Sequence, residues 1–160
     1  MKFTTLSAAV ALAALSAFGS AAQAQTARPS LDLATAKAIG EGCEKYAASK
    51  GWRMIIAVHD TAGNPKYFSR MDDSILISVN VARLKADTSA SLPVSTRQFR
   101  DLSKGIPTAE LLPRTTAIIG GLPIMSAKGV HLGGVGVSGG TEEEDEECAK
   151  KGLEAAKSLL

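Results

Sequence analysis

The chain has 160 residues, of which 45% are hydrophobic, and it carries a formal net charge of +2 at pH 7. That length predicts one domain with a modest core. So small a net charge argues against a protein that binds nucleic acid or an anionic membrane surface.

The first 24 residues have the features of a secretory signal peptide. Lys2 gives a positive start, residues 6–18 are mostly apolar, and Ala22-Gln23-Ala24 matches a small-x-small cleavage site. The apolar run is too short to span a membrane, and no later run approaches that length. We therefore expect a periplasmic or secreted protein in which residues 25–160 form a single domain.

Two cysteines remain, Cys43 and Cys148, and both fall on apolar faces of predicted helices. Exported proteins usually meet an oxidising environment, so one interpretation is a disulfide between the first and last helices. The other interpretation is two separate buried thiols. Neither cysteine lies in a CxxC or CxxCH pattern, which leaves a redox motif or covalent haem attachment unsupported.

A helix and a hairpin are predicted in the first half of the chain. Apolar residues at spacings of three and four predict a helix with Asp32 as its N-cap and Gly51 as its left-handed C-terminal cap. Residues 52–59 and 66–71 have the composition of two strands, and the polar segment 60–65 has that of the turn between them.

The second half predicts two or three helices and three short strands. Helical periodicity returns over 74–90, and a shorter, more polar helix follows over 94–99. Three strands are expected at 115–119, 124–126 and 130–137, with a turn at 120–123. Strands joined by hairpins rather than by helices favour an antiparallel sheet with helices packed on it, which is the α+β class.

The glycine-rich strand at 130–137 leads directly into the last helix. Thr141 and Glu144 have the spacing of a capping box, and we expect the helix to run to Leu160. Glycines inside a strand usually mark a bulge or a close approach to the backbone. They indicate either tight packing of this strand against a helix or room for a ligand or a neighbouring subunit.

Few side chains suggest catalysis. His59 and His131 both lie in predicted strands without metal-ligand spacing, and the two-histidine helix motif, the GxSxG elbow and the P-loop are absent. Arg70 ends a strand and Asp72 precedes a helix, a pair that could position a carboxylate-bearing ligand or simply fix the exit of the hairpin.

Three blocks of sequence, in the same order, match a known family: AVHDTAGNPKYFSRMDDS, ARLKADTSA and GGLPIMSAKGVHLGGVGVSGGTEEEDEECAKKGL. Over residues 31–160 the chain resembles the GlcG/HbpS proteins, which are often described as haem-binding or haem-degrading. The resemblance implies a profilin-like α-β-α arrangement, with an antiparallel sheet of about five strands and helices on both faces. It also implies assembly into dimers or larger homo-oligomers.

The resemblance further implies a set of cofactor-binding residues: Asp60, Arg70, Asp72, Lys85, Thr88 and Thr96. The first five lie in blocks that match the family's D-x-G, R-M-D and K-A-x-T motifs, although Asn64 replaces the second glycine of the family's turn. Thr96 is the nearest match to a threonine linked to haem in the family, and it is otherwise a helix cap. His59 departs from the family, in which an apolar residue usually precedes the aspartate.

Haem requires an apolar surface, a cation for its propionates and preferably one axial ligand. The candidate cations are Arg70, Lys85 and Arg97, and the candidate ligands are His59, His131, Met71 and Tyr67. Because only 4% of the residues are aromatic, a haem site shared between subunits is easier to build than one within a single chain.

Three functions are compatible with these residues. The favoured one is an exported, oligomeric haem- or tetrapyrrole-binding protein. The second is an enzyme that degrades haem or acts on a small organic acid at a cluster of Asp60, Arg70 and Lys85. The third is an assembly or partner protein whose pocket is vestigial.

Overall fold

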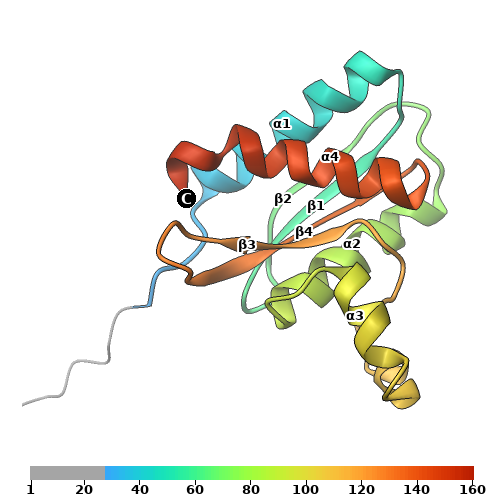
Figure 1. The fold of residues 1–160 in the computed structure, drawn as a ribbon. Helices are drawn as coiled ribbons and strands as arrows, with labels where there is room; N and C mark the ends of the chain where they lie inside the picture. The colour runs from blue at the N-terminus through green and yellow to red at the C-terminus, as the bar shows by residue number, and fades with distance from the viewer. Residues whose placement is uncertain (1–27) are drawn as a thin grey trace, which may run out of the picture.

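The structure, a computed structural model, describes residues 28–160, so the expected signal peptide lies outside the described residues. Within this range the chain forms four α-helices and four strands (Figure 1). In chain order they are α1 (Leu33–Lys50), β1 (Ile55–Asp60), β2 (Pro65–Arg70), α2 (Ile77–Ser91), α3 (Thr96–Ser103), β3 (Gly121–Met125), β4 (His131–Ser138) and α4 (Glu142–Ala155), with short 3-10 helices η1 (Pro107–Leu111) and η2 (Lys157–Leu159).

The strands form one sheet in the order β2-β1-β4-β3, and every neighbouring pair is antiparallel. Helices α1 and α4 cover one face of this sheet and α2 covers the other (Figure 1). The larger hydrophobic core lies under α1 and α4. A smaller one lies under α2 and consists of Ile55, Ala57, Ala82 and Ala86. The predicted α+β class, with helices on both faces, is confirmed.

The expectation of about five strands is wrong, because residues 115–119 do not form a strand. Their backbone donors bond to side chains instead: Thr116 N donates to Thr88 Oγ1 at 2.9 Å, and Ile119 N donates to Glu142 Oε1 at 3.0 Å. The turn expected at 120–123 is also wrong, since β3 begins at Gly121 and pairs with β4.

The helices begin and end close to the predicted capping residues, and two of the predicted helix ends are wrong. Asp32 caps α1 by accepting a hydrogen bond from Thr35 N at 2.7 Å, and Thr141 forms the predicted capping box of α4. The cap of α3 is Ser95 rather than Thr96, because the Ser95 side chain accepts from the amide of Gln98. Helix α4 ends at Ala155, five residues before the predicted end.

The glycines of β4 allow α2 to lie directly on the sheet. A Cβ built on Gly134 would lie 2.4 Å from the carbonyl oxygen of Ala86, and one on Gly136 would lie 2.1 Å from that of Ala82. Both flanks of β4 are occupied by β1 and β3. The tight-packing interpretation is therefore correct, and the alternative that these glycines leave room for a ligand or a subunit is wrong.

Cys43 and Cys148 form a disulfide that joins α1 to α4 across a separation of 105 residues. Both cysteines are fully buried in the larger core. Of the two interpretations of the cysteines, the disulfide is the one found in the structure. None of the helices between residues 28 and 160 combines the length and apolar character needed to cross a membrane.

Candidate functional site

The two ends of the β1–β2 hairpin separate Asp60 from Arg70. Arg70 pairs with Ile55 at the start of β1, whereas Asp60 is the last residue of that strand. The Asp60 carboxylate caps its own turn, because its Oδ1 accepts from the amides of Ala62 and Asn64, each at 2.9 Å. The structure therefore does not bring Asp60 and Arg70 into one cluster.

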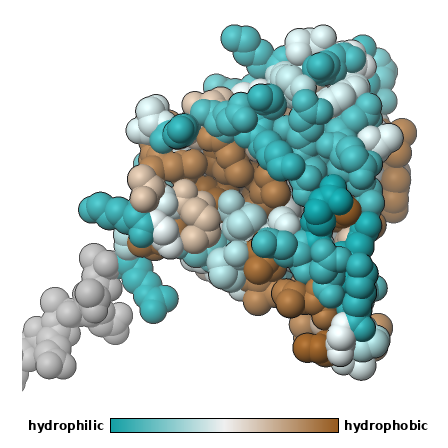
Figure 2. All heavy atoms as spheres, viewed as in Figure 1, coloured by the Kyte–Doolittle hydropathy of each residue, from teal (hydrophilic) through white to brown (hydrophobic). Residues whose placement is uncertain are grey.

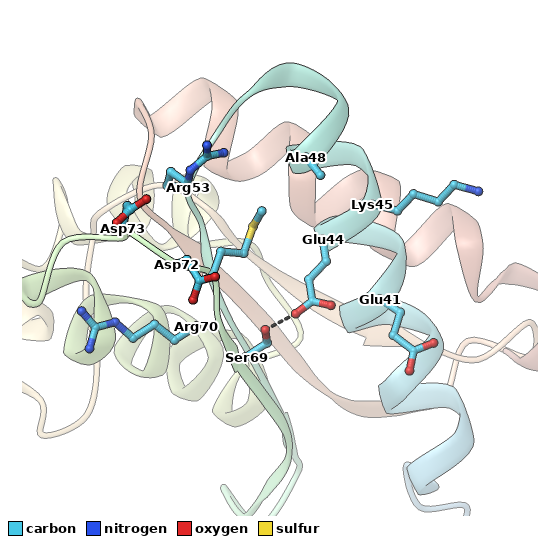
Figure 3. A pocket seen from close by; sticks show the side chains of 10 residues that line it. Glu41, Glu44, Lys45, Ala48, Arg53, Ser69, Arg70, Asp72 and Asp73 are labelled. Atoms are coloured by element: carbon cyan, nitrogen blue, oxygen red, sulfur yellow. Dashed lines mark hydrogen bonds between the residues drawn. The ribbon is translucent and has the colours of Figure 1, made fainter.

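Arg70 and Asp72 line an open groove of about 760 Å³ between α1 and the end of β2, here called the Arg70 groove (Figure 3). The Arg70 side chain extends away from Glu41 and Glu44, and its Nη2 donates to the Ser74 carbonyl at 3.0 Å. The charged side chains around the groove are four carboxylates and three cations, namely Glu41, Glu44, Asp72, Asp73, Lys45, Arg53 and Arg70. This acidic balance does not suit an anionic ligand.

Lys85 lies under the centre of the sheet and is 0% exposed. Its Nζ donates to the Val137 carbonyl and to Asp145 Oδ2, both at 2.7 Å. Burial lowers the pKa of Lys85 and raises the pKa of Asp145, and the attraction between the two charges opposes both shifts. This buried pair joins α2 to β4 and α4.

The two threonines are also engaged inside the protein. Thr88 Oγ1 donates to the Leu84 carbonyl at 2.8 Å and accepts from Thr116 N at 2.9 Å. Thr96 Oγ1 accepts from Gly121 N at 3.0 Å. Both side chains are fully buried and hold the segment that leads from η1 into β3.

A second charged cluster, which motif matching did not assign, lies on the α2 face of the sheet. His59 at the end of β1 places its Nδ1 2.7 Å from Oδ1 of Asp87, which lies on α2. Arg114 donates to both oxygens of the same carboxylate, from Nη2 at 2.8 Å and from Nε at 3.0 Å. The Asp87 carboxylate raises the pKa of the Arg114 guanidinium through these hydrogen bonds and its charge. Asp87 therefore holds a histidine and an arginine in fixed positions.

This cluster borders a cavity of about 320 Å³, here called the His59 pocket, which is lined also by Gly63, Pro65, Phe68 and Arg83. The guanidinium carbon of Arg83 lies 4.8 Å from the centre of the Phe68 ring. The pocket thus combines one imidazole, one aromatic ring and two guanidinium groups against a single carboxylate.

Comparison with known proteins identifies the family. The family model for "Haem degrading protein HbpS-like" matches residues 31–154. This chain belongs to the HbpS-like family. The GlcG/HbpS resemblance of the sequence is thereby confirmed.

Individual HbpS-like relatives agree with this assignment. Protein GlcG of Escherichia coli K12 is 34% identical over 104 residues, covering 64% of this chain and 77% of GlcG. A crystal structure of a double mutant of Streptomyces reticuli HbpS superposes with a TM-score of 0.77 at 28% identity, covering 85% of this chain and 90% of that one. The crystal structure of a PduOC:heme complex shares the fold, with a TM-score of 0.72 at 22% identity over 79% of this chain and 95% of that one.

The four candidate iron ligands of this HbpS-like chain differ in availability. Nε2 of His131 already contacts the carbonyls of Ser89 and Gly133, each at 2.9 Å. The Met71 sulfur accepts from Met54 N at 3.4 Å. Burial and the neighbouring Glu44 carboxylate raise the pKa of Tyr67 to about 12, so its phenol stays protonated at neutral pH. Among these four, Nε2 of His59 is the ligand atom without a partner in the described part of the chain.

The candidate cations differ in the same way. Arg97 forms an ion pair with Glu146 at 3.1 Å, and Lys85 is fully buried in the core. Arg70 donates to the Ser74 carbonyl beside the acidic groove. The residues of the His59 pocket fit the requirements of haem better, since the His59 imidazole, the Phe68 ring and the Arg83 guanidinium lie together, and Arg83 has no carboxylate partner within residues 28–160, whereas Arg114 is paired with Asp87.

Sequence reasoning missed Asp87, Arg83 and Arg114. Asp87 occupies the variable position of the K-A-x-T motif, and Arg114 lies in the segment wrongly predicted to lead into a strand. The signal that could have led to them was the departure at His59, because a histidine buried at a strand end needs a hydrogen-bond partner.

Proposed function

We propose that this HbpS-like protein binds haem outside the cytoplasm and works as a homo-oligomer. The match of residues 31–154 to a family described as haem-degrading carries the proposal. The shared fold with a haem complex is consistent with it. The His59 pocket supports it too, because the pocket offers the groups that haem requires.

Export is supported by two features of the chain. Residues 1–24 have the pattern of a signal peptide. The Cys43–Cys148 disulfide is typical of proteins that fold in an oxidising compartment. A periplasmic or secreted location is tested by fractionating cells that express the full chain and sequencing the N-terminus of the recovered protein, which we expect to begin after Ala24.

Assembly is supported by exposed apolar side chains. Ile75, Leu76 and Ile77 at the start of α2 are between 59% and 75% exposed. Figure 2 shows a further group of hydrophobic residues at the α3–η1 end of the molecule, where Leu102, Ile106, Leu111 and Leu112 are exposed. Apolar groups that gather at a surface commonly mark contacts with other proteins. Light scattering coupled to size exclusion should give a mass of two or more chains.

Haem binding is tested by titrating hemin into the protein formed by residues 25–160. We expect a shifted and sharpened Soret band that saturates with hemin, while hemin in buffer alone gives no such change. An unchanged spectrum with tens of micromolar folded protein would overturn the proposal.

Haem degradation is a second candidate, favoured by the description of the family. Opening the porphyrin ring requires dioxygen and electrons, so the assay supplies air and ascorbate with catalase present. Loss of the Soret band together with iron captured by a chelator would establish turnover. A stable Soret band under these conditions would leave binding as the function.

A further inference from the structure

His59 is held in one orientation by Asp87. The 2.7 Å contact between Nδ1 and a carboxylate oxygen fixes the proton on Nδ1, because a carboxylate can only accept. The neutral ring then carries its lone pair on Nε2. Histidines that bind metals almost always donate their other ring N–H to a carboxylate or a carbonyl in this way.

Nε2 of His59 makes no hydrogen bond within residues 28–160. His59 as a whole is only 5% exposed. His59 lines the His59 pocket, so the pocket is the side from which a ligand would reach this nitrogen.

Asp87 is itself prevented from turning away. Arg114 grips both of its oxygens and also donates to the Gly63 carbonyl at 3.0 Å. Arg114 has a φ of 65°, a left-handed conformation that few residues other than glycine adopt. A non-glycine residue in the left-handed conformation costs free energy, and it persists only where surrounding contacts hold it there. The loop after η1 thus clamps Asp87 against His59.

The charges and apolar surface of the pocket suit the same ligand. Arg114 is already paired with Asp87, so Arg83, which has no carboxylate partner within residues 28–160, is the cation left for an anionic group such as a propionate. Phe68, which is 38% exposed, adds an aromatic ring over which the Arg83 guanidinium lies. A cavity of about 320 Å³ lies at the lower end of the range for ligand pockets, so it would enclose only part of a porphyrin.

We infer that His59 Nε2 is the axial ligand to haem iron, with Asp87 as the positioning residue, Arg114 holding Asp87 in place, and Arg83 facing the propionates. This inference rests on the proposed haem binding. It assigns the site to the α2 face of the sheet and not to the Arg70 groove.

The test compares hemin titrations of the wild-type protein, His59→Gln and His131→Gln. We expect the wild-type and His131→Gln complexes to give the same histidine-ligated absorption and resonance Raman spectra. His59→Gln should lose the iron–histidine stretching band of the ferrous complex and bind hemin more weakly. Circular dichroism and thermal melting of the apoproteins establish that each variant folds.

Two further variants separate ligation from structure. In His59→Gly, imidazole should restore the histidine-type spectrum at concentrations that leave hemin in buffer and the His131→Gly complex unchanged, a selectivity that a merely structural role of His59 would not give. Asp87→Asn should weaken hemin binding by about 10- to 100-fold and shift the iron–histidine stretch to lower frequency, since the imidazole loses its carboxylate acceptor. Arg83→Ala should weaken binding, whereas Arg53→Ala in the Arg70 groove should not.

The outcomes distinguish the two levels of the proposal. If the wild-type protein leaves the hemin spectrum unchanged, haem binding and the ligand assignment both fall. If the wild-type protein binds hemin and His59→Gln gives the same spectrum and affinity, the ligand assignment alone is overturned. Loss of the histidine-type spectrum in His131→Gln would likewise overturn the ligand assignment and leave haem binding in place.

Discussion

Lys85, Asp87 and Thr88 lie within one turn of α2, and each serves a different partner. Lys85 bonds β4 and α4, Asp87 bonds His59 and Arg114, and Thr88 bonds the segment before β3. The family motif K-A-x-T therefore fixes the middle of the molecule in this chain. The position between its alanine and its threonine supplies the carboxylate of the candidate site.

Replacing Lys85 tests its buried ion pair. Lys85→Met removes the cation and leaves Asp145 buried without its partner, which should lower the free energy of unfolding by about 3–5 kcal/mol. The double variant Lys85→Met with Asp145→Leu should be less destabilised than Lys85→Met alone, because no unpaired charge remains. Urea unfolding followed by circular dichroism measures both values. A double variant as unstable as Lys85→Met alone would contradict this account.

Acid should weaken the contact that holds residues 118–120. The hydrogen bond from Arg100, together with that from Ile119 N, lowers the pKa of Glu142 below its ordinary value of 4.5. The pKa of such a carboxylate is lower in the folded than in the unfolded protein. The group therefore stabilises the fold at any pH above its unfolded pKa, and this stabilisation is lost as the pH falls through the folded pKa. Glu142→Gln should therefore reduce stability at pH 7 and flatten its decline below about pH 4.5. Glu154→Gln, at an exposed pair with Lys151, serves as the control.

At the level of elements, contact between α2 and β4 depends on the absence of side chains. The backbone of α2 lies so close to Gly134 and Gly136 that a Cβ at either position would overlap it. The small core of Ile55, Ala57 and two alanines of α2 lies beside this contact, between α2 and the sheet. The same contact positions Asp87 above the end of β1.

Gly136→Ala tests this contact. The added methyl would lie 2.1 Å from the Ala82 carbonyl, so α2 must move away from the sheet. Overpacking of this kind should cost about 1–3 kcal/mol of stability or more. Gly105→Ala, whose nearest atom would be 3.7 Å away, should leave the melting temperature nearly unchanged. Equal melting temperatures for the two variants would contradict the close packing.

Local patterns predicted most elements, and distant partners explain the failures. Asp32 and Thr141 mark helix starts because a cap bonds within its own turn. Residues 115–119 have the composition of a strand, yet their amides bond to Thr88 and Glu142, which are 28 and 23 residues away. The prediction of the candidate site failed for the same reason. The partner of His59 is Asp87, 28 residues later in the chain, and the partner of Asp87 is Arg114, a further 27 residues on. No short motif contains such a pair.

On the scale of the whole molecule, the Cys43–Cys148 disulfide ties the first helix to the last. It closes a loop of 105 residues that contains the entire sheet. A cross-link of this length restricts the unfolded chain strongly. The most exposed large apolar side chains lie elsewhere, at the start of α2 and around α3 and η1.

Removing the disulfide should lower the free energy of unfolding by about 2–5 kcal/mol. Urea unfolding of Cys43→Ala with Cys148→Ala measures the loss, and the wild-type protein in reducing buffer should approach the same midpoint. The variant should unfold in the same way with or without reductant. A midpoint equal to that of the oxidised wild-type protein would contradict a stabilising bond.

The disulfide also makes the two sides of the sheet unequal. It anchors α1 and α4, whereas α2 and the Arg114 loop are held by noncovalent contacts alone in the described residues. In amide hydrogen exchange, local openings below the global unfolding free energy should therefore appear first in α2 and residues 104–120 and last in α1 and α4. The His59 pocket lies on the side that opens, so a large planar ligand could enter and leave while the disulfide-bonded half of the protein stays intact.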